Sequence, residues 1–187
     1  MKSYSKKSFK KDLGTPITTA KKHWVAYILP LLLTASGIAL LSTNEGLLKV
    51  TGGILLLGSV IRMIQIGSEK WHLTEEHLFI ERGIGPKKTY QKVPVTDLYK
   101  SSTSTNKIGR KLNFGSVTAK RRSDHCTGLR HSIISNPKQF HLHISTVVQN
   151  SSAKDLNKFY ELKEHGIITE NEYDIIKLGY ITKHHLT

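Results

Sequence analysis

Cysteine is almost absent from this sequence, in which Cys126 is the only one among 187 residues. An intrachain disulfide is therefore impossible, and the composition lacks the signature of an oxidising compartment. Acidic residues are also scarce, because 14 Asp and Glu stand against 28 Lys and Arg and leave a formal net charge of +14. Such a charge could attract nucleic acid, anionic lipid headgroups or an acidic protein, since all three present arrays of negative charge.

The common catalytic and nucleotide-binding motifs are missing as well. Gly83-x-Gly85 has no third glycine and no strand-to-helix setting, and no Gly-Lys-Ser/Thr phosphate loop occurs. The sequence contains neither a Gly-x-Ser-x-Gly nucleophile elbow nor a His-Glu-x-x-His metal helix. We therefore expect a protein that is not an enzyme and that needs no cofactor.

Ten histidines raise the question of a metal site. His141 and His143 are two residues apart, so on a helix they point about 200° apart and cannot share one ion. His125, Cys126 and His131 are close in sequence, but a three-ligand set with one cysteine is a weak match to a zinc site. Surface polar residues are the more frequent explanation, and we expect no metal.

Two long apolar runs lie near the N-terminus, at 24–41 and 47–66. The first has no charged residue, and the second has charges only toward its ends, at Lys49 and Arg62. Each run approaches the roughly 20 residues that a helix needs to cross a bilayer. Because only 42–46 separates them, they predict two transmembrane helices in a tight hairpin. The alternatives are buried core helices or a cleaved signal peptide, although a signal peptide usually has a shorter basic region and a shorter apolar stretch.

Lysine and arginine are distributed unevenly around these runs. Seven precede the first run, none lies in 42–46, and Lys70 follows the second run with more basic residues beyond it. Because cytoplasmic flanks of membrane helices are enriched in Lys and Arg, we expect a multi-pass protein of the inner membrane with both termini in the cytoplasm. Trp24, Tyr27 and Trp71 are placed like interfacial aromatic anchors.

Small residues in the runs predict that the two helices pack on each other. Ala35 and Ala39 form a small-xxx-small pair on the first run. The second run offers a small-residue surface made of Gly52, Gly53, Gly58 and Ser59. No acidic residue lies in the middle of either run, which argues against a transport path.

Net charge separates the chain into regions. It is +6 in 1–23, +1 in 24–66, +8 in 67–150 and −1 in 151–187. The basic arm 1–23 is expected to be disordered, and it could orient the spans or serve as a contact site.

A basic cluster in the soluble region is the best candidate for a functional patch. Next to a membrane segment, the simplest partner is anionic lipid, and the alternative is a solvated basic face. Nucleic acid is not the expected partner, because membrane attachment restricts access and no nucleic-acid motif accompanies the cluster. The candidate lipid-binding or anion-binding residues are Lys107, Arg110, Lys111, Lys120, Arg121, Arg122 and Arg130.

The region 68–150 alternates strand-forming residues with turn signals. Strands are expected at 70–74, 77–83, 87–91, 95–100, 115–121 and 129–135. The Ser/Thr-rich stretch 101–105 and the segment 107–112 are expected to be loop or short helix. Asn136-Pro137 is typical of a helix start, and Phe140, Ile144 and Val147 then recur on one helical face. The predicted class is α+β, with antiparallel strands closed by one helix.

Four segments of this region together resemble the bacterial pleckstrin-homology-like domain that commonly follows two membrane spans. They are WHLTEEHLFIERG (71–83), YQKVPVTDL (90–98), LNFGSV (112–117) and ISNP (134–137). The resemblance implies an antiparallel β-sandwich or barrel capped by a C-terminal helix over 68–150. It also implies a role in membrane-associated assemblies without catalysis.

The tail 152–187 predicts a small helical hairpin. Ser152 with Asp155 is placed like a capping box, and the first helix should stop at Gly166 with a left-handed C-cap. A second helix should start at Thr169 with Glu172. Two short helices bury little surface alone, so either a partner or the preceding domain must cover them. The candidate protein-interaction residues are Leu156, Phe159, Leu162, Ile167, Ile168, Tyr173 and Ile176.

The stretch LNKFYELKEHGIITENEY (156–173) closely resembles SHOCT, the short C-terminal domain of many bacterial proteins. The resemblance implies protein contacts or oligomerisation and no catalytic role. We therefore expect a non-catalytic, membrane-anchored scaffold or oligomerisation module at the cytoplasmic face. Its partners would be membrane lipids, a second copy, or other membrane or cytoplasmic proteins. The alternative is a membrane-surface module that binds anionic phospholipid through its basic domain.

Overall fold

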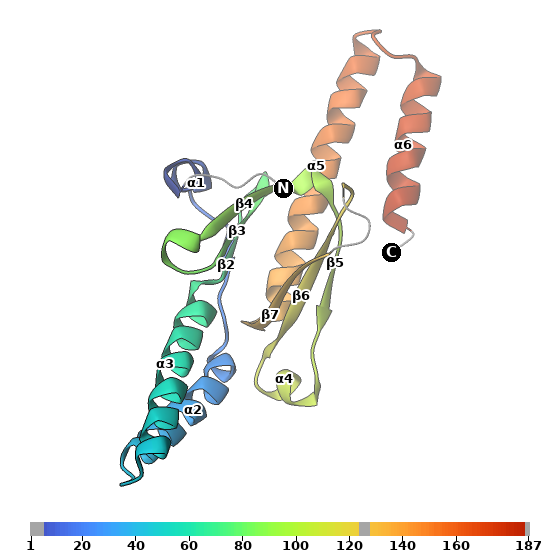
Figure 1. Cartoon of the computed structure of the whole chain (residues 1–187). Coiled ribbons are helices and arrows are strands. Elements are labelled where there is room, and N and C mark those ends of the chain that lie inside the picture. The colour runs from blue at the N-terminus through green and yellow to red at the C-terminus, as the bar shows by residue number, and fades with distance from the viewer. Residues whose placement is uncertain (1–5, 124–127, 186–187) are drawn as a thin grey trace.

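The computed structural model describes residues 6–123 and 128–185. It has the α+β class that the sequence predicts: an apolar helical hairpin, two antiparallel sheets and a long helix that covers their core (Figure 1). The hairpin and the distal end of the long helix extend from opposite ends of the sheets.

The apolar hairpin consists of α2 and α3. A short 3-10 helix, η1 (Trp24–Tyr27), leads into α2 (Ile28–Leu41), and α3 spans Gly46–Ser68. Both Trp24–Leu41 and Gly46–Ser68 are long and apolar enough to cross a membrane, close to the predicted bounds. In each of them only 11% of the most apolar window is buried. Neither helix is therefore a core helix of the soluble part.

The arm that precedes the hairpin is ordered from Lys6 onward, so the prediction of disorder is wrong there. It forms α1 (Lys6–Leu13) and β1 (Thr18–Ala20). Phe9 in α1 is only 1% exposed and contacts Phe79 and Tyr90. Disorder was predicted from the high charge of the arm, and the contribution of one buried aromatic side chain was not considered. Residues 1–5 lie outside the described part of the chain.

The first sheet has the strand order β1-β2-β3-β4, and all its strands are antiparallel. Its other members are β2 (Lys70–Leu73), β3 (His77–Arg82) and β4 (Thr89–Pro94), with a 3-10 helix, η2 (Gly85–Lys87), before β4. In the pairing of β1 with β2, Thr18 lies opposite Leu73 and Ala20 opposite Trp71. The whole apolar hairpin is therefore the connection between two hydrogen-bonded neighbours.

The second sheet has the order β5-β6-β7. Its elements are η3 (Val95–Asp97), β5 (Leu98–Ser104), α4 (Lys107–Lys111), β6 (Phe114–Arg121) and β7 (Leu129–Ser135). β5 includes most of the Ser/Thr-rich stretch that was predicted to be a loop or short helix. In β5, Ser102 lies opposite Thr118 and Thr103 opposite Val117. Pairing with β6 and exposure of alternate side chains suit these small polar residues, so the loop prediction is wrong.

The segment after β1 connects the two sheets. The His23 amide donates to the carbonyl of Ile133 at 2.8 Å, and the Ser135 amide donates to the carbonyl of Lys21 at 3.1 Å. Lys22 forms a bridge with Ile134 between them. Residues 18–23 thus pair first with β2 and then with β7.

Helix α5 (Pro137–Glu164) covers the core with its first half, where Phe140, Ile144 and Val147 are buried as predicted. They share one core with residues of both sheets: Ala20, Trp71, Leu73, Leu78, Ile80, Val93, Val95, Leu98, Val117, Ala119, Leu129 and Ile134. The second half projects beyond the sheets, and α6 (Glu170–His185) turns back beside it (Figure 1).

The boundary predicted at 150–152 does not exist, because α5 is continuous through it. Ser152 and Asp155 lie inside the helix, and no proline or glycine interrupts the chain from Lys138 to Glu164. A capping pattern does not by itself start a new helix where neither proline nor glycine has ended the preceding one. The tail is therefore the distal half of α5 together with α6.

The turn between α5 and α6 follows the prediction. Gly166 has φ of +67°, which provides the left-handed residue after the helix. The amide of Thr169 donates to Glu172 Oε2 at 2.8 Å, and the amide of Glu172 donates to Thr169 Oγ1 at 3.3 Å. This reciprocal pair is the predicted capping box of α6.

Candidate functional site

Small residues bring α2 and α3 into close contact. A Cβ on Gly37 would lie 2.9 Å from the carbonyl oxygen of Gly52, and a Cβ on Gly52 would lie 2.7 Å from that of Gly37. The hydroxyls of Thr34 and Ser59 lie 2.7 Å apart across the same interface. Gly52 and Ser59 were predicted to be contact residues, whereas Gly37 was missed.

Two other glycines of the predicted contact surface do not belong to it. A Cβ on Gly53 or Gly58 would meet nothing within 4 Å. The interface therefore uses one narrow stripe of α3, and it leaves the outward faces of both helices to large apolar side chains. Leu29, Leu47 and Ile54 are at least two-thirds exposed. Apolar surface of this extent is typical of a surface that lipid or another protein covers.

Replacing Gly52 with leucine is expected to separate the two helices, because the new side chain has no space against α2. Such overpacking costs about 2 kcal/mol, which lowers the ratio of chains with packed helices to chains with separated helices roughly thirtyfold. Disulfide formation between cysteines introduced by Thr34→Cys and Ser59→Cys, in a Cys126→Ser background, measures the closure. Gly53→Leu is the matched control and should leave the yield unchanged. Equal yields for the two leucine variants would contradict the observed interface.

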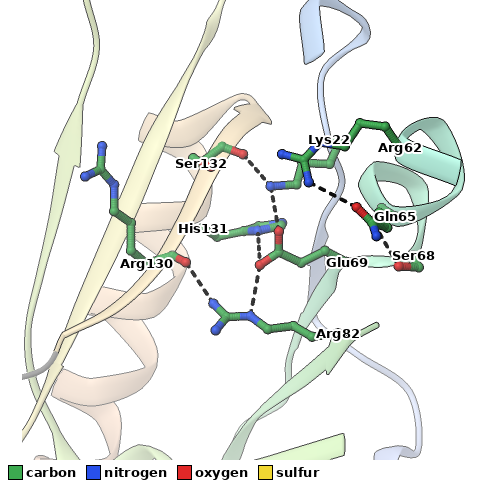
Figure 2. A network of polar contacts seen from close by, with 9 residues as sticks. All are labelled: Lys22, Arg62, Gln65, Ser68, Glu69, Arg82, Arg130, His131 and Ser132. Carbon is green, nitrogen blue, oxygen red and sulfur yellow. Dashed lines mark hydrogen bonds and ion pairs between the residues drawn. The ribbon is translucent and has the colours of Figure 1, made fainter. Parts of the chain in front are cut away.

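Glu69 lies directly after α3, where three basic side chains reach it (Figure 2). Lys22 Nζ lies 2.7 Å from Oε2, and Arg82 Nε donates to Oε1 at 2.9 Å. His131 Nδ1 lies 3.4 Å from Oε1. These partners come from the arm, from β3 and from β7, so one carboxylate joins both sheets to the end of the hairpin.

Two of these partners also bind the backbone of the second sheet. Lys22 Nζ donates to the carbonyl of Ser132 at 2.8 Å, and Arg82 Nη2 donates to the carbonyl of Arg130 at 2.9 Å (Figure 2). Lys22 is nearly buried, with 9% of its side chain exposed. A charge held this far from water requires its counterion, so Lys22 depends on Glu69, and the cluster forms a joint between the sheets and the hairpin.

The electrostatics of this joint keep Glu69 ionised. Burial raises the pKa of Glu69, but contacts with His131 and Lys22 lower it by more, and the pKa falls from 4.5 to about 2. Burial lowers the pKa of His131 below its ordinary value, so this imidazole is neutral at pH 7. His131 is fully buried and stacks on Trp71 at 5.2 Å. It is not the surface residue that the sequence suggested.

The seven basic candidates do not form one patch. Lys107, Arg110 and Lys111 are exposed on α4, at the end of the second sheet from which the hairpin leaves (Figure 1). Lys120, Arg121, Arg122 and Arg130 lie toward the opposite end of β6 and β7. Along β6 the second group begins about 13 Å from Phe114, at Arg130 opposite Thr118, and reaches about 25 Å at Arg121.

The group at the far end is also partly neutralised. Arg121 Nε donates to Asp97 Oδ2 at 2.8 Å, which engages its charge within the fold. Arg122 is only partly exposed. Three of the seven residues therefore remain as a basic group next to the hairpin, and the prediction of a single cluster is wrong.

No protein-family model matches the chain, and neither does any curated protein or solved structure.

The tail residues pack partly on each other. Phe159 contacts Tyr180 with ring centroids 6.4 Å apart, and Tyr160 contacts Tyr173 at 5.9 Å. Of the seven tail candidates, Ile167 is 67% exposed. The others are half-buried: Leu156, Phe159, Leu162, Ile168, Tyr173 and Ile176.

A groove of about 540 Å³ runs between β5 and α5, and Tyr180 of α6 lies at its edge. Ser101 Oγ lies 2.6 Å from His141 Nδ1 and 3.2 Å from Ser145 Oγ. No sequence pattern pointed to this contact, because Ser101 was expected in a loop. Among the described residues that line the groove, none has a carboxylate that could orient the imidazole. The arrangement therefore lacks the third group of a nucleophilic triad, and it links β5 to α5.

Metal ligands do not gather in the described residues, where no group of three or more His, Cys, Asp or Glu could hold an ion. His141 makes the serine contact above, and His131 faces Glu69 and Trp71. His125 and Cys126 lie outside the described residues.

Proposed function

We propose that this chain is a non-catalytic integral membrane protein that holds a small scaffold against the cytoplasmic face. The main support is the apolar hairpin. Its two helices are long and apolar enough to span a bilayer, and most of their residues are not buried. The joint at Glu69 fixes the domain to the end of this hairpin.

Charge supports the orientation. The basic arm and the basic soluble region both lie at the open end of the hairpin, whereas the connecting segment 42–46 has no Lys or Arg. This distribution favours both termini in the cytoplasm. Trp24 begins the first span, and it is exposed there as an interfacial anchor would be.

The proposal includes the two domain resemblances. Two antiparallel sheets with a helix over their shared core are compatible with a pleckstrin-homology-like domain. The turn at Gly166 and the capping box at Thr169 are compatible with a SHOCT hairpin. The arm contributes β1 to the first sheet, so the proposed domain comprises residues 6–23 as well as 68–150.

The tail is the proposed contact site for a second copy or another protein. It projects beyond the sheets (Figure 1). Helix α6 carries Ile175, which is 70% exposed. Its region has a net charge of −1, in contrast to the basic remainder of the chain. Opposite charge of this kind favours head-to-tail contact between copies.

Replacing Ile175 with aspartate is expected to reduce crosslinked complexes in native membranes about tenfold. A carboxylate without a partner at a contact costs more than about 1.4 kcal/mol. The matched control is Lys177→Gln, which makes the net charge more negative by the same amount at an exposed position about 200° around α6 from Ile175. The measurement is chemical crosslinking of the full chain followed by gel analysis. An unchanged crosslinking pattern in Ile175→Asp would remove this face of the tail from the proposal.

A further inference from the structure

Helix α4 lies beside the start of the first apolar helix. Phe114, which follows α4, stacks on His23 with centroids 5.3 Å apart and planes inclined by 29°. His23 in turn caps η1, because its Nδ1 accepts a hydrogen bond from the Val25 amide at 3.3 Å. Any membrane that covers the hairpin from Trp24 onward therefore has its surface next to α4.

The orientation of α4 is fixed by its packing. Asn106 accepts a hydrogen bond from the Gly109 amide at 2.6 Å and caps the helix. A Cβ on Gly109 would collide with the carbonyl oxygen of Phe114, so the helix lies directly against the backbone of β6. α4 is consequently a rigid projection of the second sheet.

The outer surface of α4 is amphipathic. Ile108 and Leu112 are 62% and 41% exposed, and their spacing of four residues places them on one side. Lys107, Arg110 and Lys111 are exposed on the other side, again at helical spacing. None of these three cations forms an ion pair with the described residues.

We propose that α4 is an interfacial foot that binds anionic phospholipid headgroups of the bilayer in which the hairpin lies. Lys107, Arg110 and Lys111 contact the phosphates, while Ile108 and Leu112 enter the layer beside Trp24. This inference rests on the proposed membrane crossing. A bilayer fits better than free phosphate or nucleic acid, because neither of these would cover the two exposed aliphatic side chains.

The test uses the full chain reconstituted into vesicles, with Cys126→Ser and a polarity-sensitive dye on a cysteine introduced by Ile108→Cys. A second preparation carries the dye on Leu57→Cys, in the middle of α3. We expect the dye at 108 to report an apolar environment when phosphatidylglycerol is added to phosphatidylcholine. The dye at 57 should report lipid in both vesicles. Added salt should weaken the signal at 108.

Charge variants identify the responsible residues. Lys107→Gln, Arg110→Gln and Lys111→Gln together should lower the bound population of the foot on the order of 100-fold, because each cation near anionic lipid contributes about fivefold. The matched control replaces three lysines far from α4 with glutamine. They are all exposed: Lys100 and Lys120 at the far end of the same sheet, and Lys158 in the distal half of α5. The control should keep the signal.

The outcomes separate the foot from the anchor. A dye at 108 that stays in water in both vesicles, while the dye at 57 is in lipid, overturns the foot and leaves the membrane crossing intact. Both dyes in water overturn the crossing itself. Equal losses in the two triple variants, or release of the signal by inorganic phosphate at matched ionic strength, overturn the assignment to bilayer lipid at α4.

Discussion

Glu69→Ala is expected to lower the free energy of unfolding by about 3 kcal/mol, because it leaves nearly buried Lys22 and partly buried Arg82 without a counterion. The pKa gives a similar magnitude. A carboxyl with a pKa of about 2 in the folded state and 4.5 in the unfolded state is stabilised by at most about 3.5 kcal/mol, at about 1.4 kcal/mol for each tenfold change in proton affinity. Screening by solvent at this half-buried carboxyl lowers the value toward about 3 kcal/mol. Urea unfolding in detergent, followed by Trp71 fluorescence in a Trp24→Phe background, measures the loss.

The same joint predicts loss of stability in acid. Between pH 4.5 and about 2 the unfolded chain protonates Glu69 while the folded chain does not, so the unfolded state binds more protons and stability falls as pH falls. His131 acts in the same direction below pH 6.5, since burial lowers its pKa and the unfolded imidazole charges first. Glu69→Gln should therefore flatten the stability profile between pH 4.5 and 2.

Glu75→Gln is the matched control, because Glu75 is an exposed carboxyl whose nearest basic group, Lys154, is 3.8 Å away. Its profile should follow that of the unmodified chain. Parallel profiles for Glu69→Gln and the unmodified chain would show that the ion pairs of Glu69 contribute nothing to stability.

Phe9→Ala is expected to destabilise the chain by about 3 kcal/mol, as large-to-small substitutions of buried aromatics do. The Phe9 ring meets Phe79 edge to face at 5.2 Å and Tyr90 at 4.8 Å, on a face of the first sheet apart from the main core. The same urea titration measures the effect, with exposed Lys10→Ala as the control. If both variants unfold like the unmodified chain, the arm is not a part of the fold.

The features that the sequence predicts well are those encoded in contiguous residues. The apolar runs give the hairpin because crossing length and composition are local properties. The turn at Gly166 and the cap at Thr169 are equally local. β3 was predicted correctly because several adjacent strand-forming residues lie between turn signals.

The features that were missed depend on partners distant in sequence. β1 is three residues long in a basic arm, and only its pairing with β2, beyond the hairpin, makes it a strand. Glu69 meets Lys22, Arg82 and His131, which no spacing rule connects. One usable signal was present, since a carboxylate at the end of a membrane-length run must find a counterion.

The error in grouping the basic candidates could have been avoided from the sequence, by considering the length of a strand. Lys107 and Lys120 were grouped as neighbours, although most of the predicted strand 115–121 lies between them. A strand of eight residues carries its ends about 25 Å apart. The length of the predicted strand is therefore sufficient to divide the cluster into two groups.

The insertion of the hairpin between β1 and β2 has a consequence for the order of folding. During synthesis, β1 leaves the ribosome well before its partner β2, and the first sheet cannot close until α3 is complete. In the proposed inserted state, the bilayer holds α2 and α3 antiparallel and brings the two strands together. Membrane insertion then largely offsets the entropic cost of closing a loop of this length. We therefore expect insertion to precede and accelerate folding of the two sheets.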